Sequence, residues 1–224
     1  MLIAIDGPVA AGKSTVGKLI AKKFGFPFLD TGLMYRALTW KVLEQNIDPS
    51  DEKRIGKLIE VINIKIESYP KNALLKLKIN GKELEEELRS PEVEKAVSLV
   101  SRLSSVREFM VRQQQKVAKL LPNLVMAGRD IGTVVLPDAD HKYFLIASSG
   151  TRTERRLKEI KEKGEQVDYG SLLQKIEDRD EIDIKRSISP LRPADDAIVI
   201  NTDNLSAEQV TEKILTYINN INSN

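Results

Sequence analysis

The sequence predicts an α/β fold in which helices flank a parallel sheet of about five strands, with a small antiparallel insert. Short apolar runs recur along the 224 residues, and several are nearly unbroken, as in parallel strands that are buried on both faces. Stretches with a helical spacing of apolar residues separate these runs. The predicted strands are Leu2–Asp6, Phe26–Leu29, Leu124–Ala127, Tyr143–Ala147 and Ala197–Asn201.

Two of the predicted helices carry a capping signal at their amino end. In a capping box, a serine and a glutamate or glutamine three residues later satisfy exposed backbone N–H groups of the first turn. Ser105 and Glu108 have this spacing at the start of a helix predicted to reach residue 121. Ser206 and Gln209 repeat it at the start of the last helix, whose apolar residues form one stripe.

A stretch of different periodicity predicts a β-insert at residues 60–90. Apolar and polar residues alternate through 62–67 and again through 75–80, which is typical of antiparallel strands with one face in water. A turn is expected between them at Pro70–Asn72. The Asn-Gly pair at 80–81 is a strong hairpin signal before a short third strand. The insert is therefore predicted to contain three strands.

The chain is expected to fold as one domain, because 224 residues suffice for a single large core with additions. A charge-dense segment at 151–170, interrupted by glycines, is predicted to form a short lid. The parallel core then comprises residues 1–59, 91–150 and 171–224.

Composition argues against several classes of protein. The formal net charge is +2, so no overall field attracts nucleic acid, and no nucleic-acid partner is expected. No segment approaches the roughly 18 consecutive apolar residues of a membrane-spanning helix, and the first residues do not resemble a signal peptide. The absence of cysteine excludes disulfides, and a single histidine argues against a zinc site. We expect a cytoplasmic monomer without a membrane partner.

The segment GPVAAGKST matches the phosphate-binding pattern G-x-x-x-x-G-K-[ST] and lies between a predicted strand and the helical pattern of Thr15–Phe24. Glycines permit backbone angles and a close approach that side chains would prevent, so successive N–H groups can surround a phosphate. Lys13 is expected to contact the β- and γ-phosphates of ATP, and Ser14 to bind Mg²⁺. The predicted ATP-binding residues are Gly7, Pro8, Val9, Ala10, Ala11, Gly12, Lys13, Ser14 and Thr15.

A nucleotide-binding loop alone fits either a kinase or a nucleotide-dependent switch. A GTP-dependent switch would need N-K-x-D after a strand and D-x-x-G near the γ-phosphate. The sequence NTDN at 201–204 lacks the lysine of the first pattern, and the second pattern occurs nowhere in the chain. A small-molecule kinase needs instead a second phosphate site and cations over the transferred group, which arginines can supply.

Residues suited to a second phosphate site follow two other predicted strands. Thr31 and Arg36 follow the second strand, and Arg129 and Asp130 follow the third. Ligands of open α/β sheets bind at the carboxyl ends of the strands, so we expect these side chains to lie near the phosphate-binding loop.

Two further arginine groups lie in the carboxyl-terminal part of the chain. Arg179, Asp183 and Arg186 have a spacing that places them on one face of a helix. Each group alone could be a solvated surface with ordinary ion pairs, but both fall where a lid closing over a phosphoryl transfer needs cations. The arginines of the predicted lid are Arg152, Arg155 and Arg156.

Four segments in order resemble those of bacterial cytidylate kinases, the CMP/dCMP kinases: IDGPVAAGKST, DTGLMYR, AGRDIGTVVLPDA and RDEIDIKRSISPL. The resemblance extends over nearly the whole chain and includes the three-stranded insert. It implies a P-loop kinase fold and an ATP- and Mg²⁺-dependent transfer to CMP and dCMP, with the insert as the part that binds the nucleoside monophosphate (NMP). Another P-loop small-molecule kinase, for UMP or shikimate, and a non-catalytic switch are the alternatives.

The resemblance also implies roles for single residues. The catalytic residues would be Lys13, Arg129, Arg155 and Arg179. The substrate-binding residues would be Thr31, Arg36, Ser98, Arg107, Asp130, Arg179, Asp183 and Arg186. Among them, Arg179 and Arg186 would bind phosphate and Asp183 the sugar hydroxyl.

Within the acceptor site, the resemblance assigns the CMP phosphate to Thr31 and Arg36, with threonine where relatives often have serine. It assigns the cytosine ring to Ser98, Arg107 and Asp130. The exocyclic amine of cytosine is a donor that a carboxylate can accept, whereas uracil has a carbonyl oxygen at that position.

The metal site is less defined by the sequence. No acidic residue ends the predicted strand that contains YFLIA, where many P-loop proteins bind Mg²⁺. We therefore expect Ser14, phosphates and water to hold Mg²⁺, and no second protein ligand is assigned.

Overall fold

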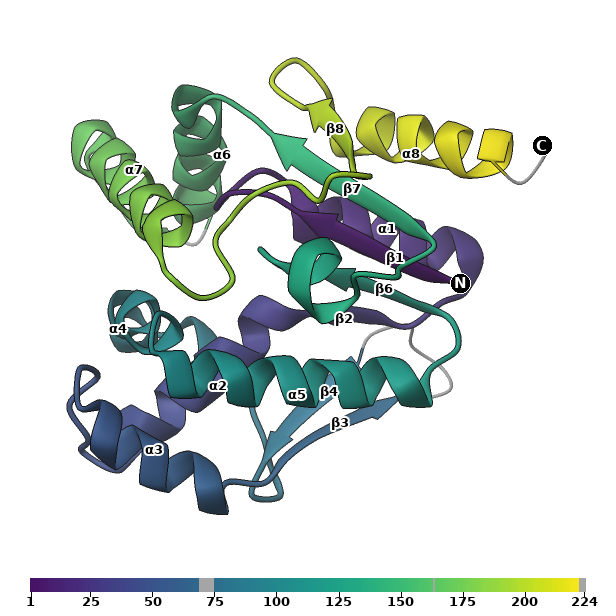
Figure 1. Cartoon of the computed structure of the whole chain (residues 1–224). Helices are drawn as coiled ribbons and strands as arrows, with labels where there is room; N and C mark the ends of the chain where they lie inside the picture. Colours follow the sequence, from purple (N-terminus) through teal and green to yellow (C-terminus); the bar gives the residue numbers. More distant parts are fainter. Residues whose placement is uncertain (69–74, 163, 222–224) are drawn as a thin grey trace.

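The computed structural model describes residues 1–68, 75–162 and 164–221. Its centre is a five-stranded parallel sheet with the strand order β2-β6-β1-β7-β8, which confirms the predicted fold class (Figure 1). The first and third predicted strands have the predicted bounds, and the other predicted strands differ slightly at their ends. The strands are β1 (Leu2–Asp6), β2 (Phe28–Asp30), β6 (Leu124–Ala127), β7 (His141–Ile146) and β8 (Ile198–Asn201).

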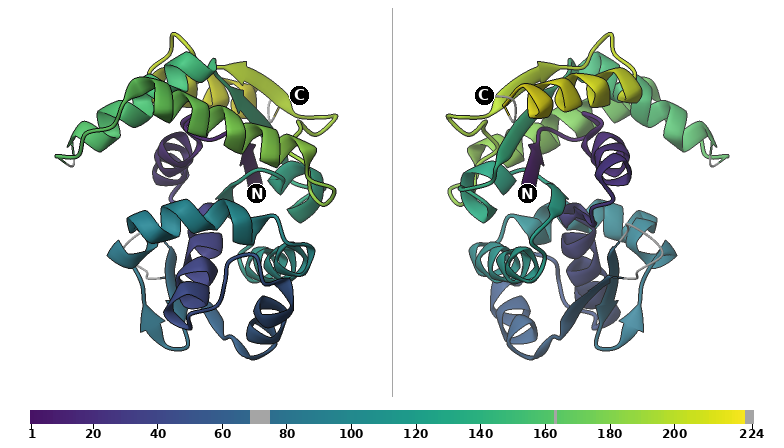
Figure 2. Two further views of the ribbon diagram at one scale, coloured as in Figure 1. Left: turned by 90° about the vertical axis from the view of Figure 1, so that its left-hand side faces the viewer. Right: turned by 90° about the vertical axis from the view of Figure 1, so that its right-hand side faces the viewer.

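Helices cover both faces of this sheet (Figures 1 and 2). α1 and α8 lie on one face and α2 and α5 on the other, while α6 and α7 pack against each other beside the carboxyl ends of the strands. The helices are α1 (Lys13–Phe24), α2 (Thr31–Glu44), α3 (Glu52–Val61), α4 (Pro91–Ser101), α5 (Ser104–Leu120), α6 (Ser149–Glu162), α7 (Tyr169–Lys185) and α8 (Ala207–Ile221), with a 3₁₀ turn η1 (Glu86–Arg89) and a π-helical turn η2 (Ile131–Val135).

The central strand β1 contributes to an apolar core on each side of the sheet. Ile3 and Ile5 pack with residues of α1 and α8, whereas Ala4 points the other way and packs with residues of α2 and α5. Side chains alternate between the faces of a strand, so a strand covered on both faces is apolar at every position. This is why β1 has an unbroken apolar sequence as far as Ile5.

The β-insert is an antiparallel three-stranded sheet, as predicted, formed by β3 (Ile64–Ser68), β4 (Leu75–Ile79) and β5 (Lys82–Glu83). Asn80 and Gly81 between β4 and β5 both have positive φ, 48° and 84°, as expected of a tight hairpin. The turn predicted at Pro70–Asn72 lies outside the described residues. Leu77, Ile79, Leu84 and Leu88 belong to the same apolar core as Ala4, and β4 packs against α2, which covers one face of the parallel sheet.

One of the two predicted capping boxes is wrong and the other is confirmed. α5 begins at Ser104, one residue earlier than predicted, with Leu103 as its N-cap residue and no side-chain cap. Ser105 therefore lies inside the first turn, where its hydroxyl lies 3.3 Å from a carboxylate oxygen of Glu52 and donates to it. At α8, Ser206 and Gln209 exchange the predicted pair of hydrogen bonds, at 2.8 and 3.2 Å.

Candidate active site

The loop from Gly7 to Gly12 has backbone angles that its glycines make possible. Gly7 has a φ of 147°, and a Cβ at this position would lie 2.2 Å from the carbonyl oxygen of Leu145. Gly12 has a φ of 90° and precedes α1 without a side-chain cap. The first backbone N–H groups of α1 are therefore available to an anion.

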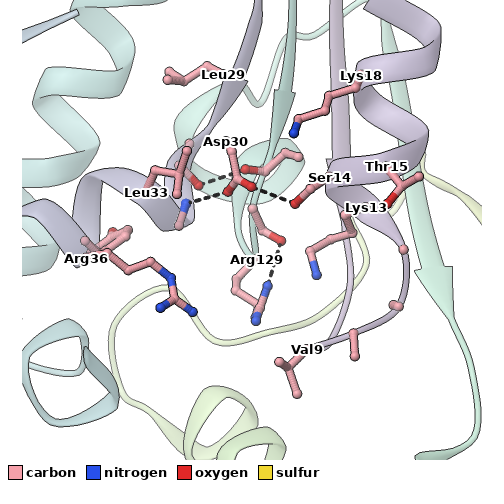
Figure 3. A pocket seen from close by; sticks show the side chains of 18 of the residues that line it. Val9, Lys13, Ser14, Thr15, Lys18, Leu29, Asp30, Leu33, Arg36 and Arg129 are labelled. Atoms are coloured by element: carbon pink, nitrogen blue, oxygen red, sulfur yellow. Dashed lines mark hydrogen bonds between the residues drawn. The ribbon is translucent and has the colours of Figure 1, made fainter. Parts of the chain in front are cut away.

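Lys13 is the first residue of α1 and points into the space enclosed by the loop (Figure 3). Its Nζ donates to the carbonyl oxygen of Pro8 at 2.6 Å, and the side chain is buried. Burial lowers the pKa of Lys13 well below its usual range, and the nearby Arg129 adds to this effect. A desolvated ammonium at a helix N-terminus is stabilised when a phosphate binds beside it.

Ser14 and Asp30 bring two oxygen ligands together beside Lys13 (Figure 3). The Ser14 hydroxyl donates to Asp30 Oδ2 at 2.6 Å, and Asp30 Oδ1 accepts from the Gly32 N–H at 3.0 Å and so caps α2. Hydroxyl and carboxylate oxygens are the ligands that Mg²⁺ prefers, so this pair fits the ion. The sequence analysis did not name Asp30, although its position at the end of a strand was a usable signal.

A cavity of about 1280 Å³ extends from the phosphate-binding loop to residues of α2, α4, α6 and α7. Lys13, Arg36 and Arg129 enter it from three different elements (Figure 3). All the predicted site residues line this cavity except Gly7, Pro8 and Ser98. On the helix that carries Ser98, the side chains that line the cavity are instead Glu94, Val97 and Ser101.

Thr31 and Arg36 of α2 lie on the acceptor side of the cavity. The Thr31 hydroxyl donates to the carbonyl oxygen of Ala127 at 2.9 Å and so joins α2 to β6. Arg36 Nη1 donates to the carbonyl oxygen of Leu88 at 3.3 Å and lies 2.8 Å from Glu94 Oε1. The guanidinium of Arg36 is thus fixed between α2 and α4.

Arg107 and Asp130 form a buried ion pair in the cavity wall, with 2.5 Å between Nη2 and Oδ2. Cζ of Arg107 also lies 5.1 Å from the centroid of the Tyr35 ring, within the range of a cation–π contact. Burial alone would lower the pKa of Arg107, but Tyr35 and Asp130 outweigh it, and the pKa lies above its usual value. The pair presents one donor group and one acceptor group to a ligand in the cavity.

Asp183 of α7 joins two of the predicted arginines. Its Oδ2 accepts from Arg129 Nε at 2.8 Å, and its Oδ1 accepts from Arg186 Nη1 at 3.1 Å. Burial alone would raise the pKa of Asp183, but Arg129 and Arg186 lower it below its usual value. A sugar hydroxyl that bound Asp183 would therefore share a carboxylate that already orients both arginines.

Arg179 lies one helical turn before Asp183 on α7, and it forms no hydrogen bond or ion pair with any other described residue. Burial lowers the pKa of Arg179 to about 10, and Arg129 is the next cause. A partly buried arginine that has no anionic partner within contact distance is well suited to bind a phosphate that enters the cavity.

The arginines of the predicted lid differ in their partners. Arg152 is buried, donates to the carbonyl oxygen of Val9 at 3.1 Å and pairs with Asp180 at 2.6 Å, so it fixes the phosphate-binding loop against α6 and α7. Arg155 Nη1 donates to the Thr202 hydroxyl at 3.1 Å.

Asp6, at the end of β1, has a structural role that the sequence analysis did not assign. Its carboxylate oxygens accept the backbone N–H groups of Ile131 at 2.9 Å and Gly132 at 2.7 Å. These bonds hold the loop that carries Arg129 and Asp130 beside the start of the phosphate-binding loop. Burial raises the pKa of Asp6 to about 6, although the two N–H groups act in the opposite direction.

A family model described as Cytidylate kinase matches residues 3–220. The chain belongs to the cytidylate kinase family. A protein from Clostridium botulinum named Cytidylate kinase is 45% identical over 216 residues, which cover 96% of each chain. A Bacillus velezensis protein of the same name is 46% identical over 216 residues, covering 96% of this chain and 95% of the relative. The resemblance inferred from the four sequence segments is thereby confirmed.

The fold also occurs in a solved structure of an uncharacterized protein from Eubacterium ventriosum, with a TM-score of 0.51 at 15% identity over 98% of both chains. Within the described ranges, no helix combines the length and the apolar character needed to span a membrane. No group of three or more histidine or acidic side chains in the described part of the chain could hold a metal by itself.

Proposed function

We propose that this member of the cytidylate kinase family transfers the γ-phosphoryl group of ATP to CMP and dCMP, giving CDP or dCDP and ADP. The observation that carries the proposal is one cavity that joins a phosphate-binding loop to the buried Arg107–Asp130 pair. The cationic side chains of Arg36, Arg129 and Arg179 line the same cavity.

The donor phosphates would bind at the loop of residues 7–15. Backbone N–H groups at the start of α1 and the Lys13 ammonium would bind the β- and γ-phosphates. When bound, Mg²⁺ would neutralise phosphate charge, and Ser14 and Asp30 are the residues that would hold it. Family membership implies ATP, and the oxygen pair at this position supports the metal assignment.

The acceptor would bind on the opposite side of the cavity. Its phosphate would contact Arg36 and the Thr31 hydroxyl, near Arg129 and Arg179. The phosphate oxygen of the acceptor would attack the γ-phosphorus, and the bond to the ADP oxygen would break. The chain contributes positioning and cationic charge to this step, and no covalent enzyme intermediate is needed.

The base would be selected by the Arg107–Asp130 pair. The carboxylate of Asp130 accepts the exocyclic amine of cytosine and repels the carbonyl oxygen that uracil has there. The predicted contact of Ser98 with the base stays a prediction, as does that of Asp183 with the sugar. Arg155 would have to turn from Thr202 to reach the transferred group, as residues of a lid do on closure.

The insert at 60–90 would belong to the NMP-binding part and the segment at 151–170 to the lid. The monomeric state, the cytoplasmic location and the absence of a nucleic-acid partner stay predictions.

A coupled assay of ADP release tests the proposal with CMP, dCMP, UMP, AMP, GMP and shikimate as acceptors. We expect release with CMP and dCMP far above that with the other acceptors. ADP release with UMP or shikimate but not with CMP would show that CMP is not the acceptor. Tight ATP binding without release for any acceptor would favour a switch.

A further inference from the structure

Glu94, on the first turn of α4, has no role in the proposed reaction and yet contacts the acceptor side of the cavity. Its carboxylate binds two arginines that come from different elements. Oε1 lies 2.8 Å from Nη1 of Arg36, and Oε2 lies 3.1 Å from Nη2 of the same side chain. Oε1 also lies 3.1 Å from Nη2 of Arg156 on α6.

The contact with Arg36 is the two-point geometry by which a guanidinium also binds phosphate. Both terminal nitrogens of Arg36 are engaged by Glu94, and Nη1 is additionally shared with the Leu88 carbonyl. Each terminal nitrogen carries two N–H groups, so Glu94 occupies the edge of the guanidinium that Nη1 and Nη2 share, and a phosphate can bind this edge only in place of Glu94.

The charge of Glu94 is maintained by its surroundings. Burial alone would raise its pKa, but Arg36 and Arg156 outweigh it, and the pKa lies below its usual value. Glu94 is thus an anion at neutral pH in the place where the acceptor would bring its own anion. Arg179, which has no anionic partner within contact distance, lines the same cavity.

We propose that Glu94 determines the affinity for the acceptor because its carboxylate is a built-in competitor for the acceptor phosphate. The proposal rests on the assignment of Arg36 to that phosphate under the proposed function. A phosphate carries more charge than a carboxylate, and Arg129 and Arg179 line the same cavity, so the phosphate displaces Glu94 from the edge of Arg36 that Nη1 and Nη2 share. Part of the binding free energy of the phosphate is then used to break an existing ion pair.

Calorimetric titration of the full chain with CMP, and separately with cytidine, tests this competition. Replacement of Glu94 by glutamine keeps the shape of the side chain and removes its charge, so we expect Glu94→Gln to bind CMP about three- to tenfold more tightly. Cytidine has no phosphate, so its affinity should stay the same. Glu92→Gln is the matched control, because Glu92 is an exposed residue of the same helical turn, and it should bind both ligands as wild type does.

Weaker or unchanged binding of CMP by Glu94→Gln would overturn the proposal, and so would an equal gain for cytidine. If Glu94→Gln does not fold, Glu94→Asp serves instead. Its shorter side chain should withdraw from Arg36, so CMP should again bind more tightly than to wild type. Unchanged or weaker CMP binding by Glu94→Asp would also overturn the proposal. Arg36→Met tests the assignment of Arg36 to the acceptor phosphate separately from the competition by Glu94. Lost CMP binding with intact cytidine binding supports Arg36 as the phosphate ligand, whereas unchanged CMP binding removes that assignment itself.

Discussion

Nη2 of Arg107 and Oδ2 of Asp130 lie 2.5 Å apart, and the side chains are 2% and 4% exposed. Arg129, the neighbour of Asp130 in sequence, is bonded instead to Asp183. Asp130 therefore does not orient Arg129 through its side chain. The carboxylate can act on a ligand directly or through Arg107, and the first prediction distinguishes these two modes.

Asp130→Asn should reduce discrimination between CMP and UMP by about ten- to a hundredfold, chiefly through poorer use of CMP. An amide can present a donor to the base where the carboxylate can only accept, and a charge-assisted hydrogen bond is worth about 1.5–3 kcal/mol. The measurement is kcat/KM for both acceptors. Equal losses for CMP and UMP would mean that Asp130 acts only by holding Arg107.

Lys13→Ala should abolish turnover while the protein stays folded. The ammonium is desolvated and its pKa is lowered, so its removal relieves a buried charge. The loss of the hydrogen bond to Pro8 acts in the opposite direction, so the melting temperature should stay close to that of wild type. Lys22→Ala, an exposed lysine of the same helix that does not line the cavity, is the control and should retain activity. Circular dichroism melts and the coupled assay provide the two readouts. Substantial activity of Lys13→Ala would contradict the donor-phosphate assignment.

Arg179→Met should lower kcat about 100- to 1000-fold and at the same time raise the melting temperature. The loss of rate follows if Arg179 is one of the cations that stabilise the transferred group, as proposed above. The gain in stability follows from the lowered pKa of Arg179, which shows that the charged form is disfavoured in the folded state. Arg112→Met, an exposed arginine of α5, should change neither quantity. A lower melting temperature would show that Arg179 has a structural role.

The parts of this molecule that follow from local sequence could be predicted. β1 is apolar at consecutive positions because both its faces are covered, and the loop at 7–15 depends on residues that are adjacent in the chain. The cap at Ser105 failed because packing, not the local pattern, placed the start of α5 at Ser104.

The remaining features depend on contacts between distant residues. Ser14 meets Asp30 across 16 positions, and Arg36 meets Glu94 across 58. No periodicity or motif marks Glu94, since an acidic residue in the first turn of a helix is common on purely electrostatic grounds. Which oxygens face which arginines is decided by the packing of α2, α4 and α6 around the cavity.

Asp6→Asn should change how stability depends on pH. The folded pKa of about 6 lies above the usual value of 3.8, so the stabilisation associated with this group is present below about pH 3.8 and is lost as pH rises through 6. Relative to Asp6→Asn, the wild type should therefore lose about 1 kcal/mol in the free energy of unfolding between pH 5 and pH 7. Urea titrations of both proteins at the two pH values measure this. A constant difference would mean that Asp6 titrates at its usual pH.

Asp30→Asn should raise the Mg²⁺ concentration required for half-maximal activity by about tenfold or more, because an oxygen ligand beside Ser14 loses its charge. Asparagine caps helices as well as aspartate does, so the bond to the Gly32 N–H and the melting temperature should persist. Asp51→Asn is the matched control: Asp51 caps α3 away from the cavity and should leave the Mg²⁺ requirement unchanged. Titration of Mg²⁺ at saturating ATP and CMP gives the comparison. If Asp30→Asn folds and requires the same Mg²⁺ concentration as wild type, Asp30 is only a helix cap. Mg²⁺ would then be held by Ser14, phosphates and water alone.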